Sequence, residues 1–457
     1  MAGAENIVVN TKLRSKKGPV DEKMEKNKKR KASAVVIHQN GSGDSNSSPS
    51  KKRKSDAQDH QEVDIDTSRP TAIFKPTKGR DWTVSIALPG SWTLNAKKPD
   101  HKTIQVGRIA RAAAVFCVDE IVVFDDDPVN VDPKVVSDKY IRQGRGKKTK
   151  QEVLDSILEE DEAWQNPDQF LYHVLSFAEC PPHLRYNAED PSLSIFQQHQ
   201  NLRFAGNLPS MDMPHHLRSH EWCQYREGVV VGPAPSPVSS SQRGKRSQKP
   251  ASAEHNYAYV KCGLPYPVRV PVPPEAPIEP AMRTTVRFEN ADPPPSWPHL
   301  SQEECENLEA TACASTLPRE ESGYYWGYTV RRAQSLSAVF AECEYPDGYD
   351  YTIGTSERGV SVHSILPGGS TAESDTKAPA SFKHLLIVFG GVAGLEPAVA
   401  NDPELVAKGL GKQTAHTLFD AWVNLVPGQG SRTIRTEEAV EFGLCALKPW
   451  VDSLYEQ

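Results

Sequence analysis

Three apolar runs in the C-terminal third of the chain are each followed at once by a segment containing glycine. Runs of this length, bounded by glycine or proline, are typical of buried strands. In an open α/β sheet, ligands bind outside the carboxyl ends of the strands, so we expect the three segments to converge on one pocket. The runs are residues 349–353, 384–389 and 418–426, and the glycine segments are 354–359, 390–396 and 427–435.

The last of these segments has the features of a strand, a rigid loop and a helix start. Pro427 ends the strand because it lacks a backbone donor. Gly428 and Gly430 allow positive φ angles and a close approach of the backbone to a ligand. Thr436 is the expected helix cap. An ordinary strand-to-helix turn explains any one such segment equally well, but three of them favour a ligand site.

The order of strand and helix patterns in the N-terminal half of the sequence predicts a parallel sheet. A β-rich run at 83–88, a helical pattern at 103–116 and a second apolar run at 119–124 follow each other in the order of a right-handed βαβ unit. The overall class is therefore α/β. Further helices are expected at 168–180, 333–342 and within 399–414, and a return to the sheet at 202–206.

Residues 226–328 have a different character, with short strand-like runs separated by segments rich in proline, serine and glycine. This pattern favours a small β-barrel. The segments 233–253 and 289–321 are expected to be surface loops. Aromatic and basic side chains that could bind single-stranded RNA, or simply alternate around the barrel, are Tyr257, Tyr259, Lys261, Arg269, Arg283 and Arg287.

The motifs TIGTSERG (352–359), FGG (389–391) and PGQGSRTIRTEEA (427–439) together resemble the SPOUT-class RNA methyltransferases. More narrowly, they are similar to the archaeal and eukaryotic branch with an inserted OB-like β-barrel. The opening ALPGS (87–91) and the block YWGYTVR (325–331) fit the same resemblance, which covers about residues 82–447. It implies a trefoil-knotted domain, S-adenosyl-L-methionine bound among the three loops, and a homodimer with sites near its interface.

The resemblance also implies site residues. Relatives of this class methylate ribosomal RNA, some at N3 of uridine, whose proton must leave. The expected catalytic residues are Arg432, Arg435 and Glu438, although arginine is a poor base and no base is named. The expected cofactor residues are Thr355, Ser356, Gly359, Phe389, Gly390, Gly391, Asn424, Pro427, Gly428, Gln429, Gly430, Ser431, Thr433 and Ile434.

RNA contacts are expected from Arg108, Arg111 and Arg331. Arg108 and Arg111 fit equally well as surface charges on an amphipathic helix, and Arg331 fits equally well as a member of a structural salt bridge. We expect no metal site, because the cluster of His215, His216, His220 and Cys223 lacks a partner pair elsewhere in the sequence.

Charge is concentrated in the first residues. Residues 1–54 hold 14 Lys and Arg against 5 Asp and Glu, a balance of +9, so the rest carries −15 of the total of −6. The basic runs 28–31 and 51–54 fit a nuclear or nucleolar address, or a tail that only aids solubility. No apolar run approaches twenty residues, so no membrane span is expected.

Four segments are therefore predicted: a disordered basic tail (1–69), the first part of the methyltransferase domain (70–225), an OB-like barrel (226–328) and the second part with the knot (329–457). The predicted function is an S-adenosylmethionine-dependent RNA methyltransferase that acts on ribosomal RNA, with N3 of a uridine as one candidate position. The alternative is a nuclear RNA-binding or scaffold protein that keeps the fold without turnover.

Overall fold

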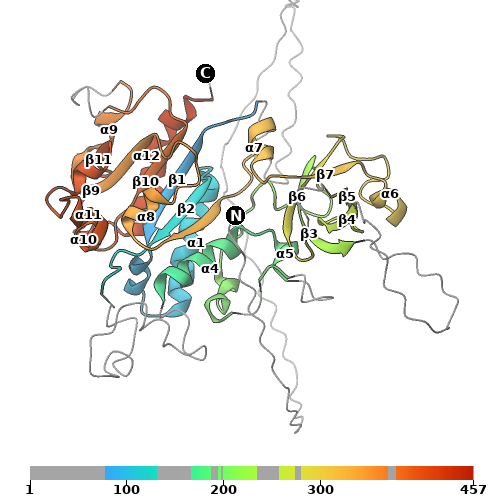
Figure 1. Ribbon diagram of the computed structural model, residues 1–457, viewed down its shortest axis with the longest axis horizontal. Helices are drawn as coiled ribbons and strands as arrows, with labels where there is room; N and C mark the ends of the chain where they lie inside the picture. The colour runs from blue at the N-terminus through green and yellow to red at the C-terminus, as the bar shows by residue number, and fades with distance from the viewer. Residues whose placement is uncertain are drawn as a thin grey trace, which may run out of the picture. The chain divides into compact units, whose positions relative to one another are not determined.

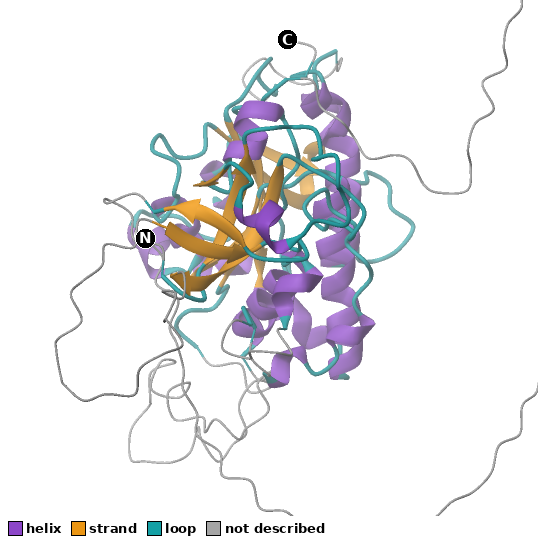
Figure 2. Cartoon of the chain, turned by 90° about the vertical axis from the view of Figure 1, so that its right-hand side faces the viewer, coloured by secondary structure: helices purple, strands orange, loops and turns teal. Residues whose placement is uncertain are grey.

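The computed structural model describes residues 78–130, 166–186, 194–196, 199–233, 257–272, 279–368 and 377–455. Within these ranges the chain forms one parallel and one antiparallel sheet, traced in Figure 1 and coloured by element type in Figure 2. The predicted tail with its basic runs, and most of the loop predicted at 233–253, lie outside the described residues. The predicted segment boundaries stay predictions.

Six of the described strands form sheet A, and every neighbouring pair in it is parallel. The adjacent parallel strands β1 and β2, joined by α1, confirm the predicted βαβ unit. In their order across the sheet the strands are β11 (Ala421–Asn424), β9 (Tyr351–Ser361), β10 (His384–Val388), β1 (Thr83–Pro89), β2 (Glu120–Phe124) and β8 (Thr329–Ala333).

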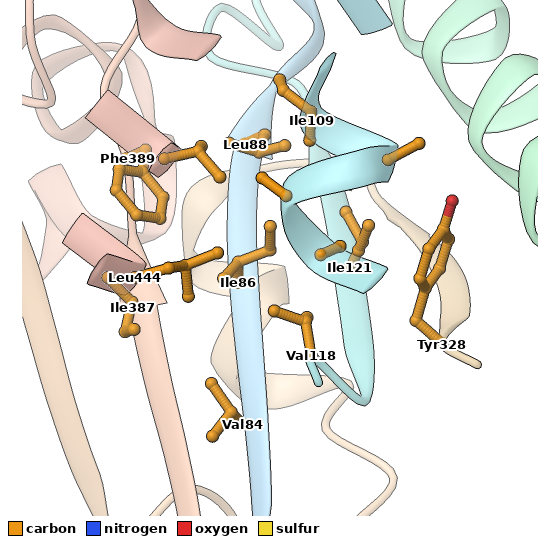
Figure 3. Packing of buried hydrophobic residues seen from close by; sticks show 14 of the residues in the cluster. Val84, Ile86, Leu88, Ile109, Val118, Ile121, Tyr328, Ile387, Phe389 and Leu444 are labelled. Carbon is orange, nitrogen blue, oxygen red and sulfur yellow. The ribbon is translucent and has the colours of Figure 1, made fainter. Parts of the chain in front are cut away.

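Helices cover both faces of sheet A because alternate side chains of its strands are buried on opposite sides. Val84, Ile86 and Leu88 of β1 face one core, and Ala87 faces the other. Figure 3 shows Ile109 and Leu444 pointing toward β1 from two helices of the first core. The first face is covered by α1 (Pro99–Val115), α4 (Pro167–Glu179) and α12 (Thr436–Asp452), and the second by α8 (Leu336–Ala341), α10 (Glu396–Asn401) and α11 (Pro403–Ala407).

The strand order places a topological switch point between β1 and β10. From β1 the chain moves to β2 and β8 on one side, and then to β9, β10 and β11 on the other. The carboxyl ends of β1 and β10 therefore open onto the crevice where α/β sheets bind ligands. The short helix η1 (Gly90–Asn95) follows β1 there. No helix in the described ranges has both the length and the apolar character needed to cross a membrane.

Sheet B is antiparallel and has its own core, which includes Val260, Val286 and Phe288. Its edge strands β5 and β7 also lie near each other, so the sheet is nearly closed. The strand-like runs expected within 226–328, at 227–231, 257–262, 268–272 and 283–288, are confirmed as strands. In sheet order the strands are β5 (Val268–Pro271), β4 (Tyr257–Lys261), β3 (Tyr225–Pro233), β6 (Arg283–Phe288) and β7 (Ala310–Cys313).

The surface loop predicted at 289–321 is wrong. This segment contains α6 (Gln302–Glu306), β7 and most of α7 (Leu317–Ser322). The sequence pattern does not reveal these elements because the segment buries few and mostly small residues: Leu300, Cys305 and Ala310 enter the core of sheet B. The β7 strand is held by its ladder with β6, which a low apolar content does not reveal.

The predicted return to the sheet at 202–206 is also wrong. The chain forms two single 3₁₀ turns there, because only Leu202 and Phe204 are large apolar residues and only Leu202 is buried in the core. Other short elements lie at α5 (Pro182–Arg185), η4 (Gln200–Leu202), η5 (Ala205–Asn207), α9 (Val362–Ile365) and η7 (Ala415–Leu418).

The glycine loop predicted after residue 353 lies inside β9. Gly354 pairs with Trp422 of β11, but the next residue of β11, Val423, pairs with Val360. Residues 355–359 therefore leave the β9–β11 ladder. A Cβ on Gly354 would lie 2.6 Å from the Trp422 ring, and one on Gly359 would lie 2.5 Å from the Val423 backbone, so glycine allows this close packing.

Candidate functional site

The three glycine segments lie together at the carboxyl edge of sheet A. We call residues 355–359, 390–396 and 425–435 the loop cluster, which leaves out Gly354 because it pairs within the sheet and adds the two residues before Pro427. The Asn424 side-chain amide donates to the carbonyl oxygen of Glu357 at 2.9 Å, and Thr436 Oγ1 donates to the carbonyl oxygen of Gly390 at 3.0 Å. These bonds hold the third segment against the first and second. The three segments therefore adjoin one another as predicted, while their convergence on one pocket and ligand binding by the cluster stay predictions.

The third segment is open. Pro427, Gly428 and residues 430–433 are exposed, and Gly428 has a φ of 75°, a conformation that favours glycine. A Cβ at Gly428 or Gly430 would meet no atom within 4 Å. The backbone N–H groups of residues 428–434 have no hydrogen-bond partner in the described part of the chain. The segment thus offers backbone donors and steric room, although the Gln429 amide donates internally to the carbonyl oxygen of Ser431.

In the first segment the predicted polar anchors are already engaged. Thr355 Oγ1 is buried and donates to the carbonyl oxygen of Val388 at 3.1 Å. Ser356 Oγ and the Arg358 guanidinium both donate to the buried Glu396 carboxylate, at 3.2 and 2.7 Å. These side chains join the first segment to the second, so they are less available to a ligand than the sequence suggests.

The second segment is a tight turn in which packing requires glycine at Gly390 but leaves ordinary van der Waals space at Gly391. A Cβ on Gly390 would lie 2.6 Å from the carbonyl carbon of Gly394, and one on Gly391 would lie 3.5 Å from Ser91 Oγ. Phe389 is fully buried, and its ring lies 3.0 Å from the Cβ position of Gly443. Its ring therefore serves the core, and only its backbone faces the cluster.

Two cavities flank the loop cluster. One of about 960 Å³ contains Gly359 of the predicted set and lies along β11 and η7; its lining residues include Arg358, Glu396, Lys412, His416 and Trp422. The other, of about 550 Å³, contains the predicted Thr433, Ile434 and Arg435; η1 and the start of α1 supply Trp92, Asn95, Ala96, Lys97, Lys98, His101 and Gln105, and the wall is completed by Val392, Thr436 and Glu437.

The three predicted catalytic residues differ in their surroundings. Arg432 and Arg435 are exposed. Glu438 accepts the backbone N–H of Arg435 at 3.0 Å, so it caps α12. Arg435 is the N-cap residue, and the predicted cap Thr436 is wrong by one position, because its hydroxyl is used on Gly390.

The three arginines predicted to contact RNA all have partners within the protein. Arg108 of α1 forms an exposed ion pair with Glu441 of α12 at 2.7 Å. Arg111 donates to the carbonyl oxygen of Met211. Arg331 pairs with Glu120 at 3.1 Å and its side chain is only 13% exposed, which fits its structural alternative. Their RNA contacts stay predictions.

Two members of the histidine cluster, His215 and His216, join a buried charge network, while His220 is exposed. His215 Nε2 lies 2.9 Å from Glu179 Oε1, and Arg283 of β6 pairs with both Glu179 and Glu227 at 2.7 and 2.6 Å. His216 Nε2 lies 2.6 Å from the Glu179 carbonyl oxygen. No group of three or more candidate ligands occurs among the described residues.

The pKa values in this network follow from burial and pairing. Burial by itself raises the pKa of Glu179, but the Arg283 guanidinium and hydrogen bonds from Arg283 and His215 hold this pKa well below its usual range. Burial, with the nearby His215, lowers the pKa of His216 to about 3. Among the predicted barrel contacts, Arg283 is thus structural, while Arg269 stacks over exposed Tyr257 at 4.8 Å.

Sequence reasoning missed the η1 and α1 side of the second cavity. Trp92 and His101 lie more than 300 residues from Arg435 in the chain, and no local pattern joins them. A weak signal existed: Lys97 and Lys98 form a basic pair directly before the Pro that begins a helix, beyond the strand of the βαβ unit.

Known proteins resemble this chain over most of its length. Residues 83–447 match the model of a family described as "Putative RNA methyltransferase". The chain is 39% identical to the human protein named 28S rRNA (uridine-N(3))-methyltransferase over 395 residues, 86% of this chain and 85% of that protein. It is 40% identical over 376 residues to the mouse protein (82% and 78%) and 38% over 366 residues to the Drosophila melanogaster protein (80% and 62%), both of the same name.

Proposed function

Because this chain belongs to that family of RNA methyltransferases, whose model spans 365 of its 457 residues, we propose that it methylates N3 of a uridine in ribosomal RNA with S-adenosylmethionine as donor. The observation that carries the proposal is the loop cluster, which lies at the carboxyl edge of sheet A where the sequence motifs predict a ligand site. The names of the human, mouse and Drosophila relatives support the atom and the RNA class.

The open third segment fits the cofactor. The free N–H groups of residues 428–434 and the space at Gly428 and Gly430 suit a flat adenine and a charged methionine tail, which need polar contacts and close backbone approach. Bound S-adenosylmethionine supplies a methyl group attached to a sulfonium sulfur. When the methyl group is transferred, the sulfur leaves as a neutral thioether. The protein must therefore align the acceptor and help the N3 proton to leave.

Arg432 is the residue we assign to the uracil ring. Its guanidinium is exposed beside the open segment and has no ion-pair partner among the described residues. Loss of the N3 proton to solvent water places negative charge on the uracil carbonyl oxygens on either side. Two donors of Arg432 can stabilise that charge, which favours the deprotonated ring without requiring arginine to act as a base.

The finer features of the class belong to the same proposal. A trefoil knot is supported by the packing of residues 357–359 against β11 and of Thr436 against Gly390.

A homodimer is supported by exposed apolar side chains on the adjacent helices α1 and α12: Ile104, Val115 and Phe442 are 44%, 52% and 43% exposed. Sheet B is the proposed OB-like module. The basic runs 28–31 and 51–54 support a nuclear or nucleolar location, which a fluorescent fusion would test.

The decisive test is calorimetric titration of S-adenosylhomocysteine into the wild type and two tryptophan variants. Gly428→Trp fills the open segment and should weaken binding at least about tenfold, a loss of about 1.4 kcal/mol. Gly348→Trp is the matched control, because Gly348 has nearly the same φ, 74°, and equally open surroundings but precedes β9 at the amino edge of the sheet. Both variants carry the same backbone strain, and only one should lose the cofactor.

Methyl transfer is measured next, on uridine-containing ribosomal RNA fragments, with the product nucleoside identified by mass spectrometry against 3-methyluridine. A folded wild type that binds no S-adenosylhomocysteine contradicts the proposed cofactor. Transfer to a different atom would leave the enzyme class standing and refute the N3 assignment.

A further inference from the structure

The 550 Å³ cavity lies at the topological switch point of sheet A. Its wall comes from η1 after β1, from Val392 after β10, and from residues 433–437 after β11. It therefore adjoins the open segment 428–434 without being lined by the glycines of that segment. A ligand group bound there would lie next to the proposed cofactor site.

The cavity is lined by an excess of basic side chains without acidic partners. Lys97, Lys98 and Arg435 are exposed and have no carboxylate within ion-pair distance in the described part of the chain. His101 adds a ring nitrogen. By contrast, Arg80, Arg108 and Arg358 are each paired with a carboxylate.

The acidic side chain in the described wall, Glu437, forms no ion pair with these three bases and offsets only part of their charge. Glu437 is only 2% exposed and accepts from the Gln105 amide at 3.3 Å, so its carboxylate is turned into the protein. Two buried polar atoms of the wall, Trp92 Nε1 and Gln105 Oε1, have no hydrogen-bond partner among the described residues. Trp92 Nε1 is a buried donor that an anion can satisfy, whereas Gln105 Oε1 is an acceptor that needs a donor such as water. Leaving either group without a hydrogen bond is costly.

Two long helices begin at this cavity. Lys98 is the N-cap of the 17-residue α1 and its side chain makes no capping hydrogen bond. Arg435 is the N-cap of the 17-residue α12. The uncapped N–H groups at the start of α1 and the positive ends of both helix dipoles add to the charge of the side chains, although Glu438 already caps α12, and together they favour an anion.

We propose that this cavity binds a phosphodiester group of the RNA substrate, with Lys97, Lys98 and Arg435 supplying the charge and the target uridine held over the neighbouring loop cluster. The proposal rests on the proposed function, since it names where that substrate is held. A carboxylate of the cofactor is the other anion of similar chemistry nearby, and the test separates the two.

The test compares Lys97→Gln/Lys98→Gln with Lys78→Gln/Lys383→Gln. Both pairs are exposed and both variants lose two charges, but Lys383 precedes β10 and Lys78 precedes β1 at the amino edge of sheet A. Binding of a fluorescein-labelled, uridine-containing single-stranded RNA is followed by anisotropy at several KCl concentrations. S-adenosylhomocysteine binding and thermal unfolding are measured on the same proteins.

We expect the Lys97/Lys98 variant to bind RNA severalfold more weakly, with the slope of log Kd against log salt reduced by about 0.7 for each phosphate that the variant no longer neutralises. Its cofactor affinity and unfolding midpoint should match the control variant, whose RNA binding and salt slope should change less.

Three outcomes would overturn the phosphate site. Unchanged RNA affinity and salt slope in the Lys97/Lys98 variant overturn it while leaving the proposed function intact. Weaker cofactor binding with unchanged RNA binding assigns the cavity to the cofactor carboxylate and overturns it as well. A wild type that binds cofactor but no RNA refutes both proposals.

Discussion

The loop cluster at the carboxyl edge of sheet A and the charge network between α4 and sheet B handle polar groups in opposite ways. In the network, Glu179, Glu227 and Arg283 are each satisfied by two or more partners. In the loop cluster, backbone donors of residues 428–434 and the guanidinium of Arg432 lack partners within the described chain. Paired charges in the network hold elements together, and unpaired groups in the loop cluster are left for a ligand.

The comparison also shows why charge alone is a poor guide to function. Arg283 and Arg331 are as basic as Arg432, and a sequence does not distinguish them. The partner of Arg283 is Glu179, about 100 residues away in the chain, and the partner of Arg331 is Glu120, about 200 residues away. Burial of a charge requires such partners, whereas an exposed charge needs none.

The largest expected effect comes from removing the centre of the network. Glu179→Ala leaves Arg283 and His215 without a principal partner in a mostly buried site, and should reduce the free energy of unfolding by about 3–5 kcal/mol. Chemical denaturation measures this change. Glu404→Ala, an exposed glutamate on α11, should cost less than about 0.5 kcal/mol. A Glu179→Ala loss below that of the control would mean that the network contributes little to stability.

A smaller effect is expected from acid. The pKa of His216 is lowered to about 3 in the folded state, so the unfolded chain binds the extra proton as pH falls below about 6.5. Stability from neutral His216 is fully present above pH 6.5 and declines as pH falls toward 3. At pH 5 the loss should be about 2 kcal/mol relative to pH 7.

Denaturation of His216→Gln at both pH values checks this, because glutamine can still donate to the Glu179 carbonyl oxygen but does not titrate. The variant should lose about 2 kcal/mol less than the wild type between pH 7 and pH 5. His299→Gln, which changes an exposed histidine, should follow the wild type. Identical pH profiles for His216→Gln and the wild type would show that His216 is not held neutral.

The smallest effect is expected at the exposed Arg108–Glu441 pair, where 41% and 33% of the side chains are accessible. A double-mutant cycle of Arg108→Gln and Glu441→Gln should give a coupling of about 0.5 kcal/mol, since exposed pairs are solvent-screened. If Arg108 also contacts RNA as the sequence suggests, Arg108→Gln will weaken RNA binding while Glu441→Gln will not. A coupling as large as that of a buried pair would remove the distinction drawn between exposed and buried charges.

Sequence patterns located the elements that bury continuous apolar runs. The strands β1, β2 and β10 and the helices α1 and α4 were placed within a few residues, because each carries its own periodic signal. The segment 289–321 was misjudged because β7 is held by ladder bonds and buries small residues such as Ala310. The cap of α12 was displaced by one residue because Thr436 finds a tertiary acceptor.

The candidate site was predictable only on one side. Its glycine segments stand out in the sequence because local geometry requires glycine there: Gly390 packs closely against the Gly394 backbone, and Gly428 has a positive φ. The opposing wall of Lys97, Lys98 and His101 has no such signature. Those residues meet Arg435 because they lie at the start of α1 and Arg435 lies at the start of α12, and these two helices pack together although they are more than 300 residues apart in the chain.

The apolar strands, the glycine segments at their ends and the family can be read from the sequence, because these depend on residues adjacent in the chain. Which charges are free depends on the folded structure. Ser356 and Arg358 are bound to Glu396, and Arg331 is bound to Glu120, whereas Arg432 and Arg435 remain open. The reason is physical: the state of a polar group is set by its burial and by partners brought to it across the fold, and neither is written in its neighbours along the chain.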